Sequence, residues 1–411
     1  MIQRHLTRRV LEALQDTPVV YIQGARQTGK STLVEAIARG PHRARYYTLD
    51  AATVLAAAQA DPEGFIAALS GPVVLDEVQR APEIALAVKA DVDKQRTPGR
   101  FLLTGSASVL ALPRVSDSLA GRMELLTLWP FSQGELAGSR ESFADRAFAG
   151  AERPEDGSKA LGPSALIDRV LLGGYPVVQT RKSAERRAAW FESYITTILQ
   201  RDVRDIAQVE NLAQVPRLLA LLASRAGSLI NYADLARSLA TPQSTLKRYM
   251  ALLEATLLVR RLPAWSANLG SRLIKSPKLL LTDTGLLAHL LGLEPARAAR
   301  DRTLFGHVLE NFVAMELVKQ LTWSQGRFQL FHFRTTGGRE VDLLLEDAAG
   351  NLVGIEVKAG ATVEAKDFAG LRFLADLVGE RFRQGFVLHT GDSAVSFQKN
   401  LHALPVEFLW R

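Results

Sequence analysis

"YIQGARQTGKST", residues Tyr21 to Thr32, decides the fold of the N-terminal part of this chain. The stretch has the Gly-x-x-x-x-Gly-Lys-Ser spacing of a phosphate-binding loop. The β-branched and aromatic run PVVYI precedes the loop and helical apolar spacing follows it, so a strand, a loop and a helix are predicted in that order. Gly24 and Gly29 allow the backbone to surround a phosphate with its N–H groups at a helix N-terminus. The sequence therefore predicts a nucleoside triphosphate site.

The side chains of this loop predict ATP with Mg²⁺ as the ligand. Lys30 would reach the β and γ phosphates, and the Ser31 hydroxyl would bind the magnesium ion. The residues predicted to bind the nucleotide are Gly24, Arg26, Gln27, Thr28, Gly29, Lys30, Ser31, Thr32 and, from a later strand, Thr104.

A second stretch, "GPVVLDEVQRAP", places the apolar run Pro72 to Leu75 directly before Asp76 and Glu77. This pattern predicts a buried parallel strand, whose C-terminal end faces the ligand crevice in an open α/β sheet. Asp76 would then hold magnesium through water, and Glu77 would orient or deprotonate the water that attacks the γ phosphate. The alternative is an exposed acidic pair after a core strand. The hydrolytic reading is favoured because the phosphate loop accompanies the pair.

Two further polar positions suit the same chemistry. The strand "RFLLTGSAS" ends in Thr104 and Ser106, which could sense the γ phosphate, although turns after strands are rich in the same residues. Arg122 lies between an expected helix and an expected strand, where it could stabilise the transition state in its own subunit or across a homo-oligomer. A solvated surface charge is the alternative for Arg122.

Four motifs together resemble the AAA+ superfamily: Gly24-Ala25-Arg26-Gln27-Thr28-Gly29-Lys30-Ser31, Leu75-Asp76-Glu77, Leu119-Ala120-Gly121-Arg122 and Gly173-Gly174-Tyr175-Pro176. More narrowly, they resemble a widespread prokaryotic family of AAA+ ATPases in which a nuclease-like C-terminal domain follows the ATPase. The resemblance spans essentially the whole chain, and Arg26-Gln27 is its most specific mark. It implies ATP binding by a P-loop ATPase fold.

The middle of the chain changes character twice. Residues 136–165 are rich in Gly, Ser, Pro and charge, which predicts an exposed excursion or linker. Two helical patterns joined by the Gly-Gly-Tyr-Pro turn follow, and would form a helical lid. Residues 215–263 then predict three helices and a hairpin, the order of a winged helix-turn-helix. Its third helix would present Gln243, Ser244, Lys247 and Arg248 to DNA, with Arg260 and Arg261 on the wing. A winged helix that packs only against protein is the alternative.

The C-terminal part predicts a second site. Its pattern is a helix with Glu310, three strands, a helix and a strand, with Asp342 on the second of these strands and Glu356 and Lys358 on the third. A turn at residues 347–351 would close an antiparallel hairpin that places Asp342 opposite Glu356, with Cβ atoms about 5 Å apart. Carboxylates this close require a cation, which predicts Mg²⁺ or Mn²⁺ held by Glu310, Asp342 and Glu356. Lys358 would stabilise the charge that develops during phosphodiester hydrolysis.

This arrangement resembles the PD-(D/E)XK nuclease superfamily. Asp342, Glu356, Val357 and Lys358 match its core, and Glu310 matches the helix carboxylate. The chain departs from the pattern at Val341, which stands where the superfamily motif has proline. The resemblance implies a restriction-endonuclease-like α/β domain, and the alternatives are a nuclease fold without activity or surface carboxylates on a hairpin.

The bulk properties agree with several folded domains. The chain has 411 residues, and a single core rarely serves more than about 300. Its net charge of +7 fits a polyanionic partner but equally fits ordinary surface bias. The absence of cysteine excludes disulfides and thiolate metal sites. No apolar run reaches the roughly 18 residues of a membrane helix, and no signal-peptide core is visible, so a cytoplasmic protein without a membrane partner is expected.

The predicted fold class is α/β, in four parts: a P-loop AAA+ ATPase core at 1–162, a helical lid at 163–212, a winged helix-turn-helix at 213–268 and a PD-(D/E)XK nuclease-like domain at 269–411. The predicted function is an ATPase that binds and remodels or processes DNA, single-stranded or branched DNA included. Catalysis is assigned to Lys30, Glu77 and Arg122 in the ATPase, and to Asp342, Glu356 and Lys358 in the nuclease-like domain. The alternative is a regulatory ATPase whose winged helix and inactive nuclease fold bind proteins.

Overall fold

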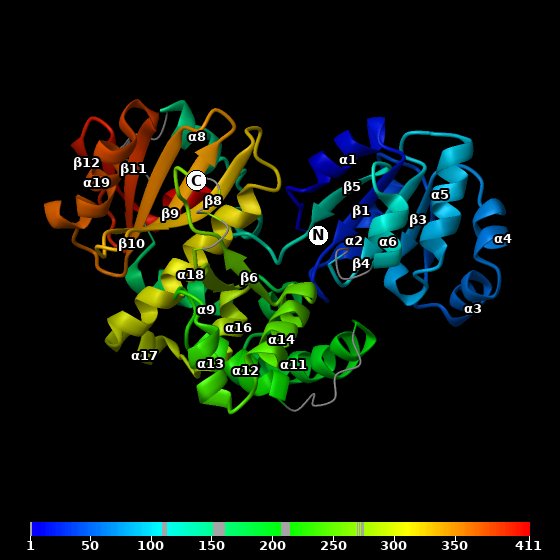
Figure 1. Cartoon of the computed structure of the whole chain (residues 1–411), viewed down its shortest axis with the longest axis horizontal. Coiled ribbons are helices and arrows are strands. Elements are labelled where there is room, and N and C mark those ends of the chain that lie inside the picture. Colours follow the sequence, from blue (N-terminus) through cyan, green and yellow to red (C-terminus); the bar gives the residue numbers. More distant parts are fainter. Residues whose placement is uncertain are drawn as a thin grey trace.

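The computed structural model describes residues 2–108, 113–150, 161–206, 214–268, 270, 272 and 275–411, and for residues 113, 114, 116 and 199–206 it describes the backbone alone. Figure 1 shows the N-terminal α/β domain on the right in blue and cyan, and the C-terminal sheet on the left in orange and red. Green and yellow helices lie below and between these two domains.

The N-terminal domain is a five-stranded parallel sheet in the order β2-β3-β4-β1-β5. Its strands are β1 (Val19–Gln23), β2 (Arg45–Thr48), β3 (Val73–Asp76), β4 (Phe101–Gly105) and β5 (Met123–Thr127). Side chains alternate along β1, so Val20 and Ile22 pack on one face with α1 (Thr7–Asp16) and α2 (Lys30–Arg39). Val19 and Tyr21 pack on the other face with α3 (Ala52–Ala60), α4 (Pro62–Ala67), α5 (Ile84–Lys94) and α6 (Pro113–Leu119).

Strand order brings the predicted catalytic segments together. Because β4 lies between β1 and β3, the segments after β1, β3 and β4 leave the same edge of the sheet as neighbours. The phosphate loop follows β1, the acidic pair ends β3 and opens a 3₁₀ turn (η1, Val78–Arg80), and Thr104 lies near the end of β4. The predicted P-loop ATPase fold is confirmed.

Residues 133–149 are not an exposed linker. They form α7 (Gln133–Ala137) and α8 (Phe143–Ala149), and the sequence prediction for them is wrong because Phe143, Ala144 and Ala147 make one buried helical face. Phe143 lies edge-on to Phe386 of the C-terminal sheet with ring centroids 5.3 Å apart. The segment therefore fastens the ATPase domain to the C-terminal domain. Residues 151–160 of the predicted linker lie outside the described residues, and its last residues, 163–165, begin a helix.

The middle of the chain is mainly helical. The predicted lid consists of α9 (Pro163–Leu172), α10 (Pro176–Gln179) and α11 (Ala184–Ile206), and α12 (Gln214–Ala223), α13 (Tyr232–Leu239) and α14 (Gln243–Ala255) follow. Strand β6 (Val259–Leu262) does not close a local hairpin but pairs antiparallel with the distant β7 (Lys278–Leu281). The domain boundary predicted at 268/269 would separate these two paired strands, so the boundary lies after β7. The helices α16 (Thr284–Leu291) and α17 (Pro295–Arg300) come next.

The C-terminal domain is a six-stranded mixed sheet in the order β12-β13-β11-β10-β9-β8. Its strands are β8 (Phe328–Arg334), β9 (Glu340–Asp347), β10 (Leu352–Lys358), β11 (Phe382–His389), β12 (Val395–Gln398) and β13 (Leu401–Pro405). Helix α18 (Arg302–Gln320) packs on one face and α19 (Ala369–Val378) on the other, and the short helices η3 (Ala365–Phe368), η4 (Gly379–Arg381) and η5 (Val406–Trp410) complete the domain. The core under α18 continues into the middle helices as one hydrophobic cluster.

The predicted hairpin register is confirmed. Strands β9 and β10 pair from Leu352 with Glu346 to Ile355 with Leu343, the register that points Asp342 towards Glu356. No helix in the described part of the chain is long and apolar enough to cross a membrane.

Candidate active site

The phosphate loop has backbone geometry that only glycine tolerates at two positions. Gly29 has φ 95°, in the left-handed region, and forms the N-cap of α2. A Cβ on Gly24 would lie 2.5 Å from the Leu128 carbonyl oxygen. Gln27, which has a Cβ, is also held at φ 61°. The loop is therefore a strained, fixed turn at a helix N-terminus, as anion binding requires.

Lys30 is buried at the first position of α2. Its ammonium donates to the carbonyl oxygens of Gly24 at 2.9 Å and Ala25 at 3.2 Å. These carbonyls belong to the loop itself, so the positive charge is held inside the curve where phosphate oxygens would lie. Thr28, also buried, donates its hydroxyl to Ala25 O at 2.9 Å and braces the loop from behind.

Asp76, at the end of β3, is only 3% exposed and accepts three hydroxyl hydrogen bonds. Oδ2 accepts from Ser31 and from Tyr46, both at 2.8 Å, and Oδ1 accepts from Thr104. Burial and the Asp76 hydrogen bond raise the pKa of Tyr46, so its phenol stays protonated and donates. Ser31 and Asp76 thus offer adjacent hard oxygen ligands, a set that fits Mg²⁺.

Glu77 is held in a left-handed conformation with φ 61° and ψ 45°. Its N–H donates to the Thr104 hydroxyl at 3.1 Å, and its carboxylate accepts from Gln79. Gln79 in turn donates to the Ser106 hydroxyl at 2.9 Å. These bonds fix the carboxylate at the cavity wall.

The nucleotide cavity, of about 800 Å³, lies between the phosphate loop and the lid. Of the predicted residues, the cavity is lined by Arg26, Gln27, Gly29, Lys30, Ser31, Thr32 and Glu77. Gly24, Thr28, Asp76 and Thr104 lie behind this lining. Thr104 is fully buried and hydrogen-bonded to Asp76 and to the Glu77 N–H, and its contact with nucleotide stays a prediction.

Helices α10 and α11 supply the opposite wall of the cavity. Trp190 and Tyr194 of α11 stack with ring centroids 4.7 Å apart, and the Tyr194 hydroxyl donates to Arg26 O at 3.1 Å. Sequence reasoning did not assign these aromatic residues to the site. The spacing of Trp190, Ser193, Tyr194, Thr197 and Ile198 on one helical face was the available signal.

The Gly-Gly-Tyr-Pro turn fixes where the lid begins. The N–H of Gly174 donates to the buried Asp283 at 2.6 Å, and a Cβ on Gly174 would lie 2.2 Å from Phe131 O. The next residue, Tyr175, is fully buried and shares a 2.8 Å hydrogen bond with the Tyr194 hydroxyl. The motif thus joins the ATPase core, the lid and α16 at one packed point.

Arg122 does not line this cavity. Its guanidinium is bidentate on Asp93 of α5, with N–O distances of 2.6 and 2.9 Å. Within one subunit, Arg122 is therefore not placed to touch the nucleotide, and a role on a neighbouring subunit stays a prediction.

The predicted acidic site in the C-terminal domain contains an unpredicted lysine. Lys278 of β7 donates to Glu310 Oε1 at 2.6 Å, and its Nζ lies 3.7 Å from Asp342 Oδ1. The second oxygen of Asp342 accepts from the Val357 N–H at 3.0 Å. Burial, followed by the charge of Asp342, raises the pKa of Glu356 well above its usual range and the pKa of Glu310 to about 7, while Lys358 acts on Glu356 in the opposite direction.

The metal predicted at this site does not fit the arrangement. Among the described residues, no group of three or more His, Asp or Glu is placed to hold a metal ion. The Glu310 and Asp342 carboxylates converge instead on the Lys278 ammonium. The structure therefore brings Glu310, Asp342 and Glu356 together as predicted, but around a lysine.

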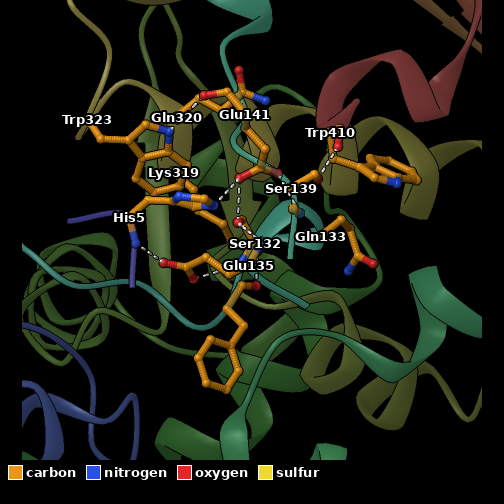
Figure 2. A network of polar contacts seen from close by, with 12 residues as sticks. His5, Ser132, Gln133, Glu135, Ser139, Glu141, Lys319, Gln320, Trp323 and Trp410 are labelled. Atoms are coloured by element: carbon orange, nitrogen blue, oxygen red, sulfur yellow. Dashed lines mark hydrogen bonds and ion pairs between the residues drawn. The ribbon is translucent and has the colours of Figure 1, made fainter. Parts of the chain in front are cut away.

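A buried polar network connects the phosphate loop with α18, and Figure 2 shows the part of it around Glu135, Glu141 and Lys319. It starts at Arg4, which donates to Thr28 O at 2.7 Å, to Trp129 O at 2.6 Å and to Glu135 at 3.1 Å. Glu135 also accepts from the backbone of Ser132 at 3.1 Å, which closes a capping box at the start of α7.

The same network continues into the C-terminal domain. The N–H of Gln133 donates to Glu316 of α18 at 2.9 Å, and Lys319 donates to Glu316 at 2.6 Å and to Phe131 O at 3.0 Å. Glu141, which accepts from Gly134 N at 2.8 Å, completes the cluster in Figure 2. Helix α18 thus contacts the ATPase domain near one end and carries Glu310 near its middle.

The proposed DNA-reading side chains are accessible, but the wing arginines are engaged. Gln243, Ser244, Lys247 and Arg248 are exposed on α14, while Leu246 of the same helix is buried. On β6, Arg261 makes a 2.7 Å bond to Glu254, and Arg260 lies 5.9 Å above the Trp129 ring. Both arginines are nevertheless exposed, so the N-terminal half of α14 and the wing are both accessible polar surfaces.

Three protein families match three successive parts of the chain. The AAA domain family matches residues 16–137, and two families described as domains of unknown function, DUF8612 and DUF4143, match residues 164–297 and 305–409. The break between the last two falls after β7, in agreement with the corrected boundary. The description of DUF4143 does not state an activity for the C-terminal domain.

Solved structures to which the chain is similar include a Walker-type ATPase of Pyrococcus abyssi, PABY2304, at 14% identity and a TM-score of 0.43. The match covers 71% of this chain and 96% of that chain. The AMPPCP-bound DnaA of Aquifex aeolicus has 14% identity, a TM-score of 0.29 and coverage of 61% and 86%. The family assignment rests on sequence relatives.

Two curated relatives are the Uncharacterized protein Rv2008c of Mycobacterium tuberculosis and the Uncharacterized protein Mb2031c of Mycobacterium bovis. Each is 35% identical over 361 residues, which cover 88% of this chain and 74% of the relative. With its AAA-type ATPase domain, the chain belongs to the same family as these two mycobacterial proteins.

Proposed function

We propose that this protein hydrolyses ATP at the phosphate loop and uses the reaction to act on bound DNA. The observation that carries the first part is the array around Asp76: three hydroxyl groups fix its carboxylate beside Ser31, and Glu77 follows at the cavity wall. Such preorganisation is expected of a carboxylate that holds a metal ion beside a phosphate, and a purely structural acidic pair would not require it.

The proposed reaction assigns one task to each group. Lys30 turns from the loop carbonyls to the β and γ phosphates and offsets their charge. Ser31 and, through water, Asp76 would hold Mg²⁺, which would supply positive charge to the phosphate oxygens. Glu77 orients the attacking water or accepts a proton from it. Gln79 and the Thr104 hydroxyl hold Glu77 in position.

The adenine ring of ATP is proposed to bind at the lid side of the cavity, against Trp190 and Pro176. Aromatic and apolar surfaces there suit a purine ring, because stacking adds about 0.5–1.5 kcal/mol beyond area burial. Since the Tyr194 hydroxyl is bonded to the Arg26 carbonyl, the lid position and the loop conformation depend on each other. Contact of the lid with ATP would therefore act on the loop through this hydrogen bond.

DNA is proposed as the partner on the strength of α14. Four polar side chains lie exposed near its N-terminal half, as on a recognition helix, and the chain carries a net charge of +7. Cleavage is not included in this proposal, because Lys278 engages the carboxylates that a metal nuclease needs. Arg122 is proposed to act, if subunits assemble, on the nucleotide of a neighbour.

The test is the ATPase rate with and without single-stranded, duplex and branched DNA. We expect at least one of these to stimulate hydrolysis, with a steep salt dependence of binding because phosphate contacts release counterions. Replacing Arg248 with Ala should weaken binding and lower the salt slope by about one, as expected for one lost phosphate contact. Arg39→Ala removes one charge from an 81% exposed side chain elsewhere and is the matched control.

Failure of every DNA to change the ATPase rate would favour the regulatory alternative, in which α14 binds a protein. Equal losses in Arg248→Ala and Arg39→Ala would show that only net charge matters, and would remove α14 from the proposal.

A further inference from the structure

Lys278 reaches the C-terminal acidic site from a different part of the chain. It is the first residue of β7, where it pairs with Leu262 of β6, and it precedes the helix and the strands from which the sequence predicted the site. Only 8% of its side chain is exposed. A lysine buried to this extent requires a compensating charge, because isolated buried ammonium groups are costly.

The charges that compensate Lys278 are the predicted metal ligands. Its Nζ lies 2.6 Å from Glu310 Oε1 and 3.7 Å from Asp342 Oδ1, and the other Asp342 oxygen is occupied by the Val357 N–H at 3.0 Å. Glu356 is 6% exposed beside Asp342. Its carboxylate lies close to α19, since a Cβ on Gly370 would lie 2.8 Å from it.

A divalent cation could not join this arrangement unchanged. Mg²⁺ needs near-octahedral oxygen ligands at about 2.0–2.1 Å, and a nitrogen cation so close to Glu310 would repel it. The lysine already supplies positive charge between two carboxylates, which removes the electrostatic reason for a metal. Lys358 lies on the Glu356 face of β10 and adds further positive charge nearby.

We infer that Lys278 is the built-in cation of the C-terminal acidic site, and that it keeps Mg²⁺ and Mn²⁺ out of the site while β7 stays in place. The domain then retains the carboxylates of a metal site without binding the metal. Removing the ammonium frees Glu310, Asp342 and Glu356 to act together as oxygen ligands. This inference is independent of the proposed ATPase and DNA functions.

The experiment is a titration of nucleotide-free, full-length protein with Mn²⁺. Binding is monitored by calorimetry and by the loss of the electron paramagnetic resonance signal of free Mn²⁺. Comparison of the wild type with Asp342→Asn identifies binding at the C-terminal site. Any Mn²⁺ held near Ser31 and Asp76 binds equally to both of these proteins. We expect the wild type and Asp342→Asn to bind equal amounts of Mn²⁺. A wild-type site that disappears in Asp342→Asn would overturn the inference.

Lys278→Met tests the reverse prediction. It should gain one Mn²⁺ site per chain with at least tenfold tighter binding than the wild type, and Lys278→Met/Asp342→Asn should lose it again. Lys278→Arg, which keeps the charge, should gain none. An unchanged ATPase rate shows that each variant is folded, and a folded Lys278→Met without the new site would contradict the inference. Should Lys278→Met fail to fold, the comparison of wild type with Asp342→Asn still decides.

Discussion

The role of Thr104 gives a prediction whose size follows from the structure. Its side chain is fully buried, donates to Asp76 and accepts from the Glu77 N–H at 3.1 Å. Thr104→Val keeps the shape but removes both bonds and leaves a buried N–H unpaired. Such a loss costs about 1–3 kcal/mol. If that energy is expressed mainly in the transition state, kcat falls about 10- to 100-fold, since about 1.4 kcal/mol corresponds to a factor of ten.

The assay separates a positioning role from nucleotide contact. Steady-state ATP hydrolysis gives kcat, and the fluorescence of a labelled ATP analogue gives the dissociation constant. Because Thr104 does not line the cavity, Thr104→Val should leave ATP affinity within about threefold, and Thr104→Ser should retain most of the activity because it keeps the hydroxyl. A loss of affinity with kcat preserved, or equal activity in wild type and Thr104→Val, would refute the reasoning.

Two other predictions concern the lid and the buried network. Trp190→Ala should raise the dissociation constant for ATP about tenfold, because it removes an aromatic contact of about 0.5–1.5 kcal/mol together with the apolar area that this contact buries. Leu377→Ala, at an exposed leucine far along the chain, is the control and should leave the dissociation constant unchanged. Burial and Glu316 raise the pKa of Glu141 to about 8. The folded protein therefore holds a proton on Glu141 that the unfolded chain releases above about pH 4.5. This group thus makes the free energy of unfolding fall as the pH rises from about 4.5 to about 8, by at most on the order of 1.4 kcal/mol per pH unit. Glu141→Gln removes that contribution, and its melting temperature relative to wild type should rise over this interval; a constant difference would contradict the assignment.

Local patterns predicted those parts of the molecule whose causes are local. The strand before the phosphate loop and the glycines within it follow from steric limits that sequence spacing records directly. The hairpin register was also accessible, because a turn at residues 347–351 and side-chain alternation together fix which residues face one another. The pairing of Asp342 with Glu356 therefore follows from the sequence alone.

The unpredicted residues owe their positions to tertiary packing. Lys278 opens the apolar strand KLLL, and nothing in its neighbourhood indicates that β7 passes beside α18. Tyr46 and Gln79 contact the carboxylates of Asp76 and Glu77 from adjacent segments, and no sequence spacing marks either residue. The Phe143 helix was hidden by the Gly- and Ser-rich composition around it, although its buried face has helical spacing.

The network around Arg4 gives the clearest physical link between the two halves. The Arg4 guanidinium is buried and donates to Thr28 O in the phosphate loop and to Glu135. Glu135 caps helix α7, and the first residue of α7, Gln133, contacts Glu316 of α18. Every group in this path is buried, so a displacement of the loop would be resisted by α18. The two domains are thus expected to respond together to ATP.

The central claim is hydrolysis of ATP with Glu77 as the base, and Glu77→Gln tests it most directly. The amide keeps the size of the side chain but cannot accept the proton. We expect this variant to bind ATP as tightly as wild type in the presence of Mg²⁺ while phosphate release falls at least 100-fold. Full hydrolysis by purified Glu77→Gln, with Lys30→Ala inactive in the same assay, would contradict the claim.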